Sequence, residues 1–443
     1  MDKRLLWIFL PIVGRILAGS PDVNAPWTVA CFWTRNFDST DSAVEKCNHV
    51  IYEDAAALDL ALNISDSVVR TKGYQSVMSF KQKNPQVKVE LSIGDWETPK
   101  ELYGMAQDIG RRENIIESSV KILEKHKFDG LHLMWGPPEK DARENFIKAS
   151  SAQKEKENLT DFIKALKVSM TKANFSFSFG IRGVLEIDCN MEVEQVYDNA
   201  DLVFVYAYGY HGSWEESTGA YAPLYPGLEG KARGLERVNS YYMTVDSTWE
   251  SLEVWGARSD KTILVISAKG NPFNLTNSSL HHGINAPNEG KWIPPLTFTE
   301  VCEKQLEGNW SIEWDSTRKQ SYTYKDNDWI SYEDACSVIE KKKFAKEKKL
   351  RGLALKDLSR DDASGECVRK TLKLLQKTKN HTALVDFSQI KESNVYFNTT
   401  YPLLRIMAAE KEQLNMCNFS CKNFNTNLQT KVLLIWMFVK SII

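Results

Sequence analysis

One strand-like segment, in the first third of the chain, carries side chains that could take part in proton transfer. Residues 128–135 read Phe-Asp-Gly-Leu-His-Leu-Met-Trp. On a strand, His132, Met134 and Gly136 share one face, with about 6–7 Å between successive members. His132 is the one that can titrate. Because it would lie deep in the fold, we expect a hydrogen-bonded core histidine rather than an acid.

The nearest carboxylate after this segment is Glu139. Pro137 and Pro138 precede it and are expected to direct the chain away from the end of the strand. Use of Glu139 as a displaced acid is therefore kept only as an alternative.

Aromatic side chains form the second group with a chemical use. The chain has 13 tryptophans among 443 residues, and indole and phenol rings often line sugar clefts. Trp135, Tyr208 and Trp214 could stack on a sugar or could simply fill the end of the fold. No His-X-X-His or Cys-X-X-Cys spacing occurs, so we predict neither a metal site nor a cofactor.

Short β-rich runs alternate with longer amphipathic stretches along the chain. Several runs are almost wholly apolar, as expected for strands buried on both faces of a parallel sheet. Eight strands that alternate with helices predict the α/β class and a closed (β/α)8 TIM barrel. The runs are Trp27–Trp33, His49–Glu53, Val87–Ile93, Phe128–Trp135, Phe175–Ile181, Leu202–Tyr208, Thr262–Ala268 and Arg351–Lys356.

The interval between the seventh and eighth runs, roughly 80 residues, is longer than one helix requires. Its aromatic residues are spaced as in antiparallel strands and turns, which predicts a small α+β insertion at approximately residues 272–345. The aromatic residues are Trp314, Tyr322, Tyr324, Trp329 and Tyr332. The basic stretch Lys341–Arg351 is expected to be a solvated helix face.

The ends of the chain differ from the predicted barrel in composition. Residues 1–20 have a basic pair, an apolar run and small residues, as in a cleaved signal peptide. We assign residues 21–380 to the barrel and 381–443 to an extension rich in Asn, Ser and Thr. Its last apolar segment, Val432–Ile443, could be a packing or amphipathic segment or a lipid-anchor signal.

The sequence favours a secreted, extracellular glycoprotein. A net charge of −2 argues against a nucleic-acid binder, and no segment is long enough to predict a transmembrane span. We expect a monomer. Nine Asn-X-Ser/Thr sites suggest glycosylation on loops. They are Asn63, Asn158, Asn174, Asn274, Asn277, Asn309, Asn380, Asn398 and Asn418.

Four segments in order resemble glycoside hydrolase family 18, the chitinases and chitinase-like lectins. The predicted insertion also lies where that family has one, and the resemblance covers roughly residues 27–367. The segments are Cys31 with 46–52 (KCNHVIY), 88–96 (KVELSIGDW), 128–135 (FDGLHLMW), and 208–214 with 222–225 (YGYHGSW and APLY).

The resemblance implies that catalysis is lost. Family members use the N-acetyl group of the substrate as nucleophile, an exception to the two-carboxylate scheme. They still need one carboxylic acid to protonate the leaving oxygen and a second carboxylate to orient the acetamide. Of the motif Asp-Gly-X-Asp-X-Asp-X-Glu, this chain keeps Asp129, and the later acidic positions hold His132, Met134 and Gly136.

The resemblance also implies that the surroundings of the acid have changed. Residues 206–209 (YAYG) stand where the family has Met-X-Tyr-Asp, and residues 269–271 (KGN) where it has Tyr-Gly-Arg. Lys356 falls on the tryptophan that floors the central sugar subsite. These positions lie at the C-terminal mouth of such a barrel, where this fold builds active sites.

The resemblance implies two disulfides, Cys31–Cys47 and Cys302–Cys367, each contributing roughly 2–4 kcal/mol. Four cysteines have no assignment, although the last two of them could close a small loop. They are Cys189, Cys336, Cys417 and Cys421.

Three functions remain open at this point. The first is a non-hydrolytic chitinase-like protein that binds chitin-type oligosaccharide or a protein receptor. The second is a signalling or effector scaffold that binds no sugar. The third is an active chitinase with a displaced acid. Barrel fold alone cannot separate them.

Overall fold

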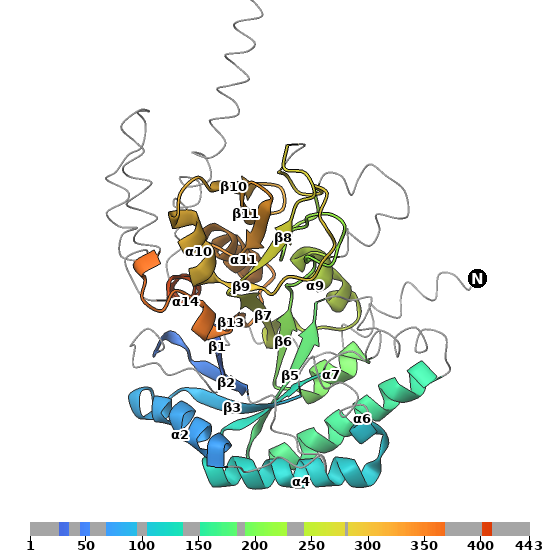
Figure 1. Cartoon of the computed structure of the whole chain (residues 1–443). Helices are drawn as coiled ribbons and strands as arrows, with labels where there is room; N and C mark the ends of the chain where they lie inside the picture. Colours follow the sequence, from blue (N-terminus) through green and yellow to red (C-terminus); the bar gives the residue numbers. More distant parts are fainter. Residues whose placement is uncertain are drawn as a thin grey trace, which may run out of the picture.

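Eight parallel strands close into a barrel in the order β1-β13-β7-β6-β5-β4-β3-β2, which confirms the predicted fold (Figure 1). The computed structural model describes residues 26–34, 45–53, 68–94, 104–135, 151–183, 191–227, 243–279, 282–367 and 401–409. The barrel strands are β1 (Thr28–Thr34), β2 (His49–Glu53), β3 (Lys88–Ile93), β4 (Gly130–Met134), β5 (Ser176–Arg182), β6 (Leu202–Tyr206), β7 (Thr262–Ser267) and β13 (Gly352–Lys356).

Helices connect the strands and pack on the outside of the barrel, as α4 and α6 do below the sheet in Figure 1. Helix α4 begins where the Asp108 side chain accepts a hydrogen bond from Arg111 N at 3.0 Å, an ordinary N-cap. The helices are α2 (Val68–Lys83), α4 (Ile109–His126), α6 (Ser151–Lys172), α7 (Val193–Asn199), α9 (Val245–Val254), α11 (Ala335–Glu347), α14 (Pro402–Ala408), and the short 3₁₀ turns η5 (Ser259–Lys261) and η6 (Leu358–Arg360).

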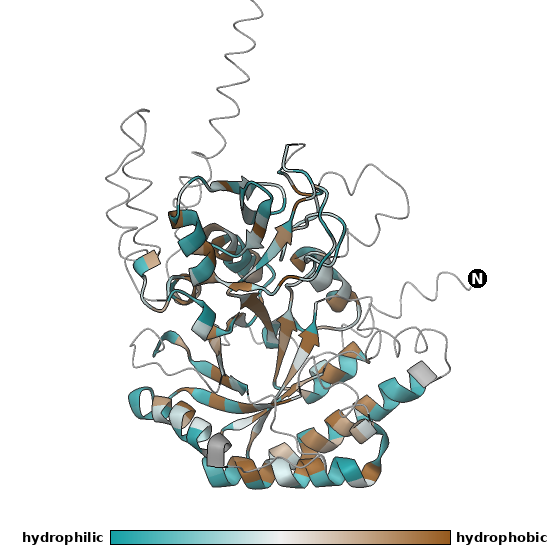
Figure 2. Cartoon of the chain, in the orientation of Figure 1, coloured by the Kyte–Doolittle hydropathy of each residue, from teal (hydrophilic) through white to brown (hydrophobic). Residues whose placement is uncertain are grey.

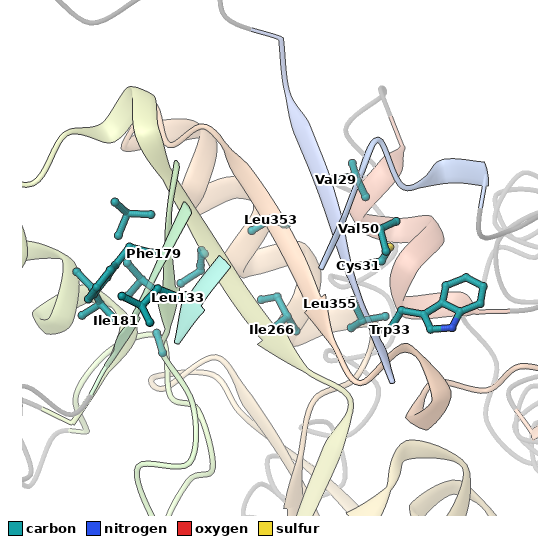
Figure 3. Close-up of a cluster of buried hydrophobic side chains, with 14 of the residues drawn as sticks. Val29, Cys31, Trp33, Val50, Leu133, Phe179, Ile181, Ile266, Leu353 and Leu355 are labelled. Atoms are coloured by element: carbon teal, nitrogen blue, oxygen red, sulfur yellow. The ribbon is translucent and has the colours of Figure 1, made fainter. Parts of the chain in front are cut away.

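The largest apolar core lies between the barrel wall and these helices. Side chains alternate along each strand, so Cys31, Leu133, Phe179 and Leu355 point outward into this layer (Figure 3). The strands are accordingly coloured mostly as hydrophobic in Figure 2. Full burial of each such side chain stabilises the fold by about 1.5–3 kcal/mol.

The predicted insertion is a separate antiparallel sheet with strand order β10-β11-β12-β8-β9. It spans residues 269–332, and the following helix α11 packs against β11 of this sheet as well as against β13 and α14. The limits of 272–345 remain a prediction. The elements are β8 (Lys269–Asn274), β9 (Leu296–Thr297), α10 (Phe298–Leu306), β10 (Ser311–Asp315), β11 (Gln320–Lys325) and β12 (Asp328–Tyr332).

Helix α14 shows that barrel packing continues beyond the predicted boundary at residue 380. Its apolar residues, among them Leu404 and Met407, are fully buried in the core between strands and helices. The Asp361 carboxylate accepts a hydrogen bond from Leu404 N at 3.2 Å, and Lys342 Nζ donates to Ile406 O at 2.9 Å. Both ends of this short helix are thus held by the barrel, although residues 401–409 lie within the predicted extension.

Two disulfides join elements of the described chain, Cys31–Cys47 and Cys302–Cys367, as the resemblance implied. Cys336 is buried on α11. The predicted signal peptide, the segments 381–400 and 410–443, and Cys189, Cys417 and Cys421 lie outside the described residues. Among the helices that are described, none combines the length and apolar character needed to cross a membrane.

Candidate functional site at the barrel mouth

Strand β4 presents its two faces to different surroundings. Leu131 and Leu133 pack with the outer helices, whereas Met134 lies in a smaller cluster inside the barrel, beside Phe32 and Tyr206. Gly136, Pro137, Pro138 and Glu139 lie outside the described residues, so their geometry remains a prediction. The described part of β4 contains no carboxylate pointing into the barrel.

His132 is completely buried and both ring nitrogens have partners. Nδ1 lies 2.8 Å from Ser178 Oγ and Nε2 lies 3.1 Å from the Tyr206 hydroxyl. Burial lowers the pKa of His132 to about 3, with Glu90 opposing and Lys356 adding to the effect. The ring is therefore neutral near pH 7 and lacks the imidazolium proton that a general acid would transfer, in agreement with the core role expected from the sequence.

Glu90 on β3 is the charge at the bottom of this polar network. It accepts hydrogen bonds from Ser176 Oγ at 2.6 Å and from Ser178 Oγ, and it lies 3.4 Å from His49 Nε2. Burial pushes the pKa of Glu90 upward, but His49 and the two hydroxyls outweigh burial, so the pKa lies below its ordinary value. Glu90 is an ionised structural acid, far below the mouth.

The mouth itself is filled by an ion pair that the sequence did not predict. Lys356, at the end of β13, bonds through Nζ to Glu53 at the end of β2. The same ammonium lies 4.9 Å from the centre of the Phe32 ring and 5.8 Å from that of Tyr206. Lys356, which occupies the position of the expected sugar-stacking tryptophan, therefore contacts aromatic rings inside the barrel.

Glu53 is an acidic group at the mouth that the sequence motifs did not indicate. Burial raises the pKa of Glu53 above its ordinary value, although Lys356 acts in the opposite direction. The alternation of His49, Ile51 and Glu53 along β2 was the available signal, because it places all three on the inward face.

A second carboxylate, Asp357, lies beside this pair. Lys269 Nζ and Arg360 Nε each approach Asp357 Oδ2 to 3.0 Å. Burial alone would raise the pKa of Asp357, but Lys356, Lys269 and Arg360 reverse the effect and hold it below its ordinary value. Asp357 also has a left-handed backbone with φ of 59°, an uncommon conformation that these contacts maintain.

The predicted sugar-stacking residues separate into two groups. Trp135 is buried in the outer apolar core, which favours a packing role over contact with a ligand. Tyr208 is half-buried above β6, with ring centres 6.1 Å from Tyr206 and 5.9 Å from Tyr221. Trp214 lies farther along the same loop and is 54% exposed.

Asn271 stands where the resemblance has an arginine, and its role is structural. The side-chain amide Nδ2 donates to His211 O at 2.8 Å and so ties β8 to the loop that follows β6. Residues Lys269 and Asn271 therefore both serve the architecture of the mouth.

The predicted glycosylation sites are not equivalent. Asn158 is buried on α6, where its side-chain oxygen accepts a hydrogen bond from Arg112 at 3.3 Å, so modification there is contradicted by the structure. Asn174, Asn277 and Asn309 are exposed, and Asn274 is half-buried in β8. The remaining sites, Asn63, Asn380, Asn398 and Asn418, lie outside the described residues. No group of three or more metal-binding side chains gathers in the described part of the chain.

Comparisons with known proteins agree with this architecture. The family model described as Glycosyl hydrolases family 18 matches residues 28–361. Human chitinase-3-like protein 2 is 26% identical over 407 residues, covering 86% of this chain and 97% of that protein.

Two solved structures are similar over the same part of the chain. One is catalytic domain 2 of the group II chitinase of Ostrinia furnacalis, with a TM-score of 0.70 and 22% identity, covering 86% of this chain and 95% of that one. The other is human YKL-39, described as a pseudo-chitinase with retained chitooligosaccharide binding properties, with a TM-score of 0.69 and 23% identity, covering 86% and 98%. Since the family match extends over well more than half of its residues, this chain belongs to Glycosyl hydrolases family 18.

Proposed function

We propose that this protein is a secreted, non-hydrolytic chitinase-like protein that acts by binding a chitin-type oligosaccharide. The observation that carries the proposal is the position of Lys356, paired with Glu53 over Phe32 and Tyr206. A pyranose cannot stack on an ammonium group as it stacks on an indole. The central sugar, whose glycosidic bond would be cleaved, therefore has no aromatic ring on which to stack.

The loss of the proton donor supports the same conclusion. Met134 carries no charge, His132 is neutral and buried, and glycine at position 136 has no side chain. General acid catalysis supplies about 10²–10⁴-fold in rate, so its loss alone would slow hydrolysis by about that factor.

Secretion and the ligand class rest on different observations. The disulfides Cys31–Cys47 and Cys302–Cys367 favour an oxidising compartment, consistent with a signal peptide at residues 1–20. Retained oligosaccharide binding in a similar pseudo-chitinase supports a sugar ligand. A protein receptor with no sugar binding is the alternative function, and we expect the molecule to act as a monomer in either case.

One structural observation favours the enzyme alternative. Glu53 is a carboxylate at the mouth whose pKa is raised by burial, as a general acid requires. Against this role, Glu53 Oε1 accepts a hydrogen bond from Lys356 Nζ. Protonation of Glu53 would leave that ammonium without its charged partner.

Hydrolysis and binding should be measured on the same secreted protein. We expect chitopentaose to be bound but not cleaved, and Glu53→Gln to leave the cleavage assay at its blank value. Turnover by the wild-type protein that disappears in Glu53→Gln would establish the enzyme alternative instead. A flat calorimetric titration up to millimolar chitopentaose would favour the protein-receptor function.

A further inference from the structure

The C-terminal ends of β7 and β13 bring three cations and one carboxylate together. Lys269 Nζ and Arg360 Nε each lie 3.0 Å from the same atom, Asp357 Oδ2. Lys356 precedes Asp357 in the chain, but its Nζ bonds to Glu53 on β2. Lys269 and Arg360 therefore share one carboxylate oxygen, and their two positive charges repel each other.

Backbone hydrogen bonds hold these two cations in place. Arg360 N donates to Asp357 O at 2.8 Å across the turn η6, and Asp357 has a left-handed backbone. Ala268 N donates to Lys356 O at 3.3 Å, which joins the two chain segments that carry the cations. A ligand that binds both cations would meet groups that are already positioned, so little conformational entropy would be lost.

The carboxylate and the two cations differ in their exposure. The side chain of Asp357 is 10% exposed, whereas those of Lys269 and Arg360 are 24% and 33% exposed. Within the described part of the chain, the terminal guanidinium nitrogens of Arg360 have no hydrogen-bond acceptor. The cations are thus more accessible to an incoming ligand than the carboxylate that orients them, and Arg360 has donors left for that ligand.

The mouth also lacks carboxylates that the family motifs have. Two acidic positions of the β4 motif hold His132 and Met134, and Gly209 stands where the family has an aspartate at the end of its sixth strand. The family's carboxylates would repel an anionic ligand, whereas these uncharged residues do not. Charge complementarity at this mouth therefore favours an anionic ligand over a neutral one.

We infer that Lys269 and Arg360 form an anion clamp that binds a carboxylate of an acidic oligosaccharide, in which N-acetylhexosamine alternates with uronic acid. A guanidinium can donate two parallel hydrogen bonds to a carboxylate, and an ammonium beside it adds another charge-assisted bond. The inference deepens the proposed function and rests on it, because it assumes that a glycan enters this mouth. The glycan would keep the amino sugar of chitin but carry negative charge.

Titration calorimetry of the full secreted chain with two matched octasaccharides tests the anion clamp. Hyaluronan octasaccharide carries carboxylates and no sulfate, and its carboxyl-reduced form has the same chain without the charge. We expect the charged form to bind about tenfold more tightly or better, because hydrogen bonds between charged groups are the stronger ones. Raising the salt concentration from about 0.05 M to about 0.5 M should reduce this preference by screening the charges.

Substitutions in the anion clamp should remove the preference. Arg360→Gln and Lys269→Met should each weaken binding of hyaluronan octasaccharide by about tenfold and change binding of the reduced form by less than about twofold. Lys291→Met is the matched control. It removes an exposed lysine that pairs with Glu289 on the insertion, and both affinities should stay at the wild-type values. Circular dichroism of each variant separates a local effect from unfolding.

The ways of failing are distinct. Binding of chitopentaose without a preference for the charged octasaccharide over its reduced form would overturn the anion clamp and leave the proposed function standing. No binding of any of the three oligosaccharides would overturn both. A preference for the charged form that persists in Arg360→Gln and Lys269→Met would place the anion site elsewhere and would also overturn the clamp.

Discussion

Two buried lysine–glutamate pairs, one at the barrel mouth and one behind the insertion, show different uses of the same chemistry. Lys341 bonds to Glu333 with each side chain about 1% exposed, whereas Lys356 and Glu53 are 10% and 15% exposed. The first pair joins the end of β12 to α11, and Ser337 Oγ donates to the second oxygen of Glu333. The second pair lies where family members accept a sugar.

The comparison distinguishes an ion pair that stabilises the fold from an ion pair that occupies the expected sugar site. A fully buried pair must have every polar atom satisfied, and removing one partner leaves the other charged in an apolar site. A pair at an opening can recruit water when it is broken. The inner pair should therefore dominate stability, and the outer pair should matter more for what enters the mouth.

The largest effect should come from the inner pair. Lys341→Met should lower the free energy of unfolding by about 3–5 kcal/mol, because Glu333 would be left buried without its cation. Urea denaturation followed by tryptophan fluorescence measures the change. Lys343→Met removes a more exposed contact with Glu340 on the same helix and should cost about 0–1 kcal/mol. Equal losses in the two variants would contradict the distinction.

The second largest effect should be a loss of folding stability at acidic pH, caused by protonation of the buried His132. The pKa of His132 falls from about 6.5 when unfolded to about 3 when folded, so the neutral ring is favoured by folding. Its contribution is complete above pH 6.5 and is lost as pH falls towards 3, on the order of 5 kcal/mol.

Stability measured from pH 7 to pH 4 tests this contribution. His132→Gln keeps hydrogen-bonding groups for Ser178 and Tyr206 but cannot titrate, so its stability should fall less steeply with acid. Parallel curves for the wild type and His132→Gln would show that other groups control acid unfolding.

The sequence predicted the fold better than it predicted the mouth. Apolar runs and helix spacing were sufficient for the eight strands, because burial on both faces of a parallel sheet leaves a strong local pattern. Helix α14 was assigned to the extension because its partners, Lys342 and Asp361, are distant in sequence. Lys341 and Lys342 were expected in solvent, yet each finds a buried acceptor that only tertiary contacts reveal.

The site shows the same division between local and distant information. Loss of the acid was visible in the β4 motif, since it concerns residue types along one strand. The pairing of Lys356 with Glu53 joins residues 303 positions apart, and no local pattern connects them. The outward direction of Trp135 follows from strand alternation and could have been predicted from Leu131 and Leu133.

The outer pair should have a smaller effect on stability than the inner pair. Lys356→Met should cost about 1–2 kcal/mol, since Glu53 can be hydrated or protonated at the opening. Removing the ammonium should also raise the pKa of Glu53 further, because Lys356 opposes the effect of burial more than Lys269 does. The variant should therefore regain stability as pH falls from 7 to 5, relative to the wild type.

A double-mutant cycle with Glu53→Gln isolates this pair from its surroundings. The cost of Lys356→Met should shrink when Glu53 is already neutral, because no unpaired charge remains. Additive losses in unfolding experiments would mean that the ion pair contributes little and that packing on Phe32 accounts for the effect.

Restoring the family's carboxylates should have the smallest effect of all. Met134→Asp with Gly136→Glu supplies the acid and the orienting group that the motif lacks, yet we expect no release of product from a fluorogenic chitobioside. Lys356 would still occupy the expected sugar floor, paired with Glu53, so a substrate ring would have no aromatic surface there on which to stack. Adding Lys356→Trp and Glu53→Ala clears the mouth and should give measurable turnover. Full activity in the carboxylate double variant alone would show that the ion pair at the mouth does not block sugar, and would leave the missing acid as the sole reason for inactivity.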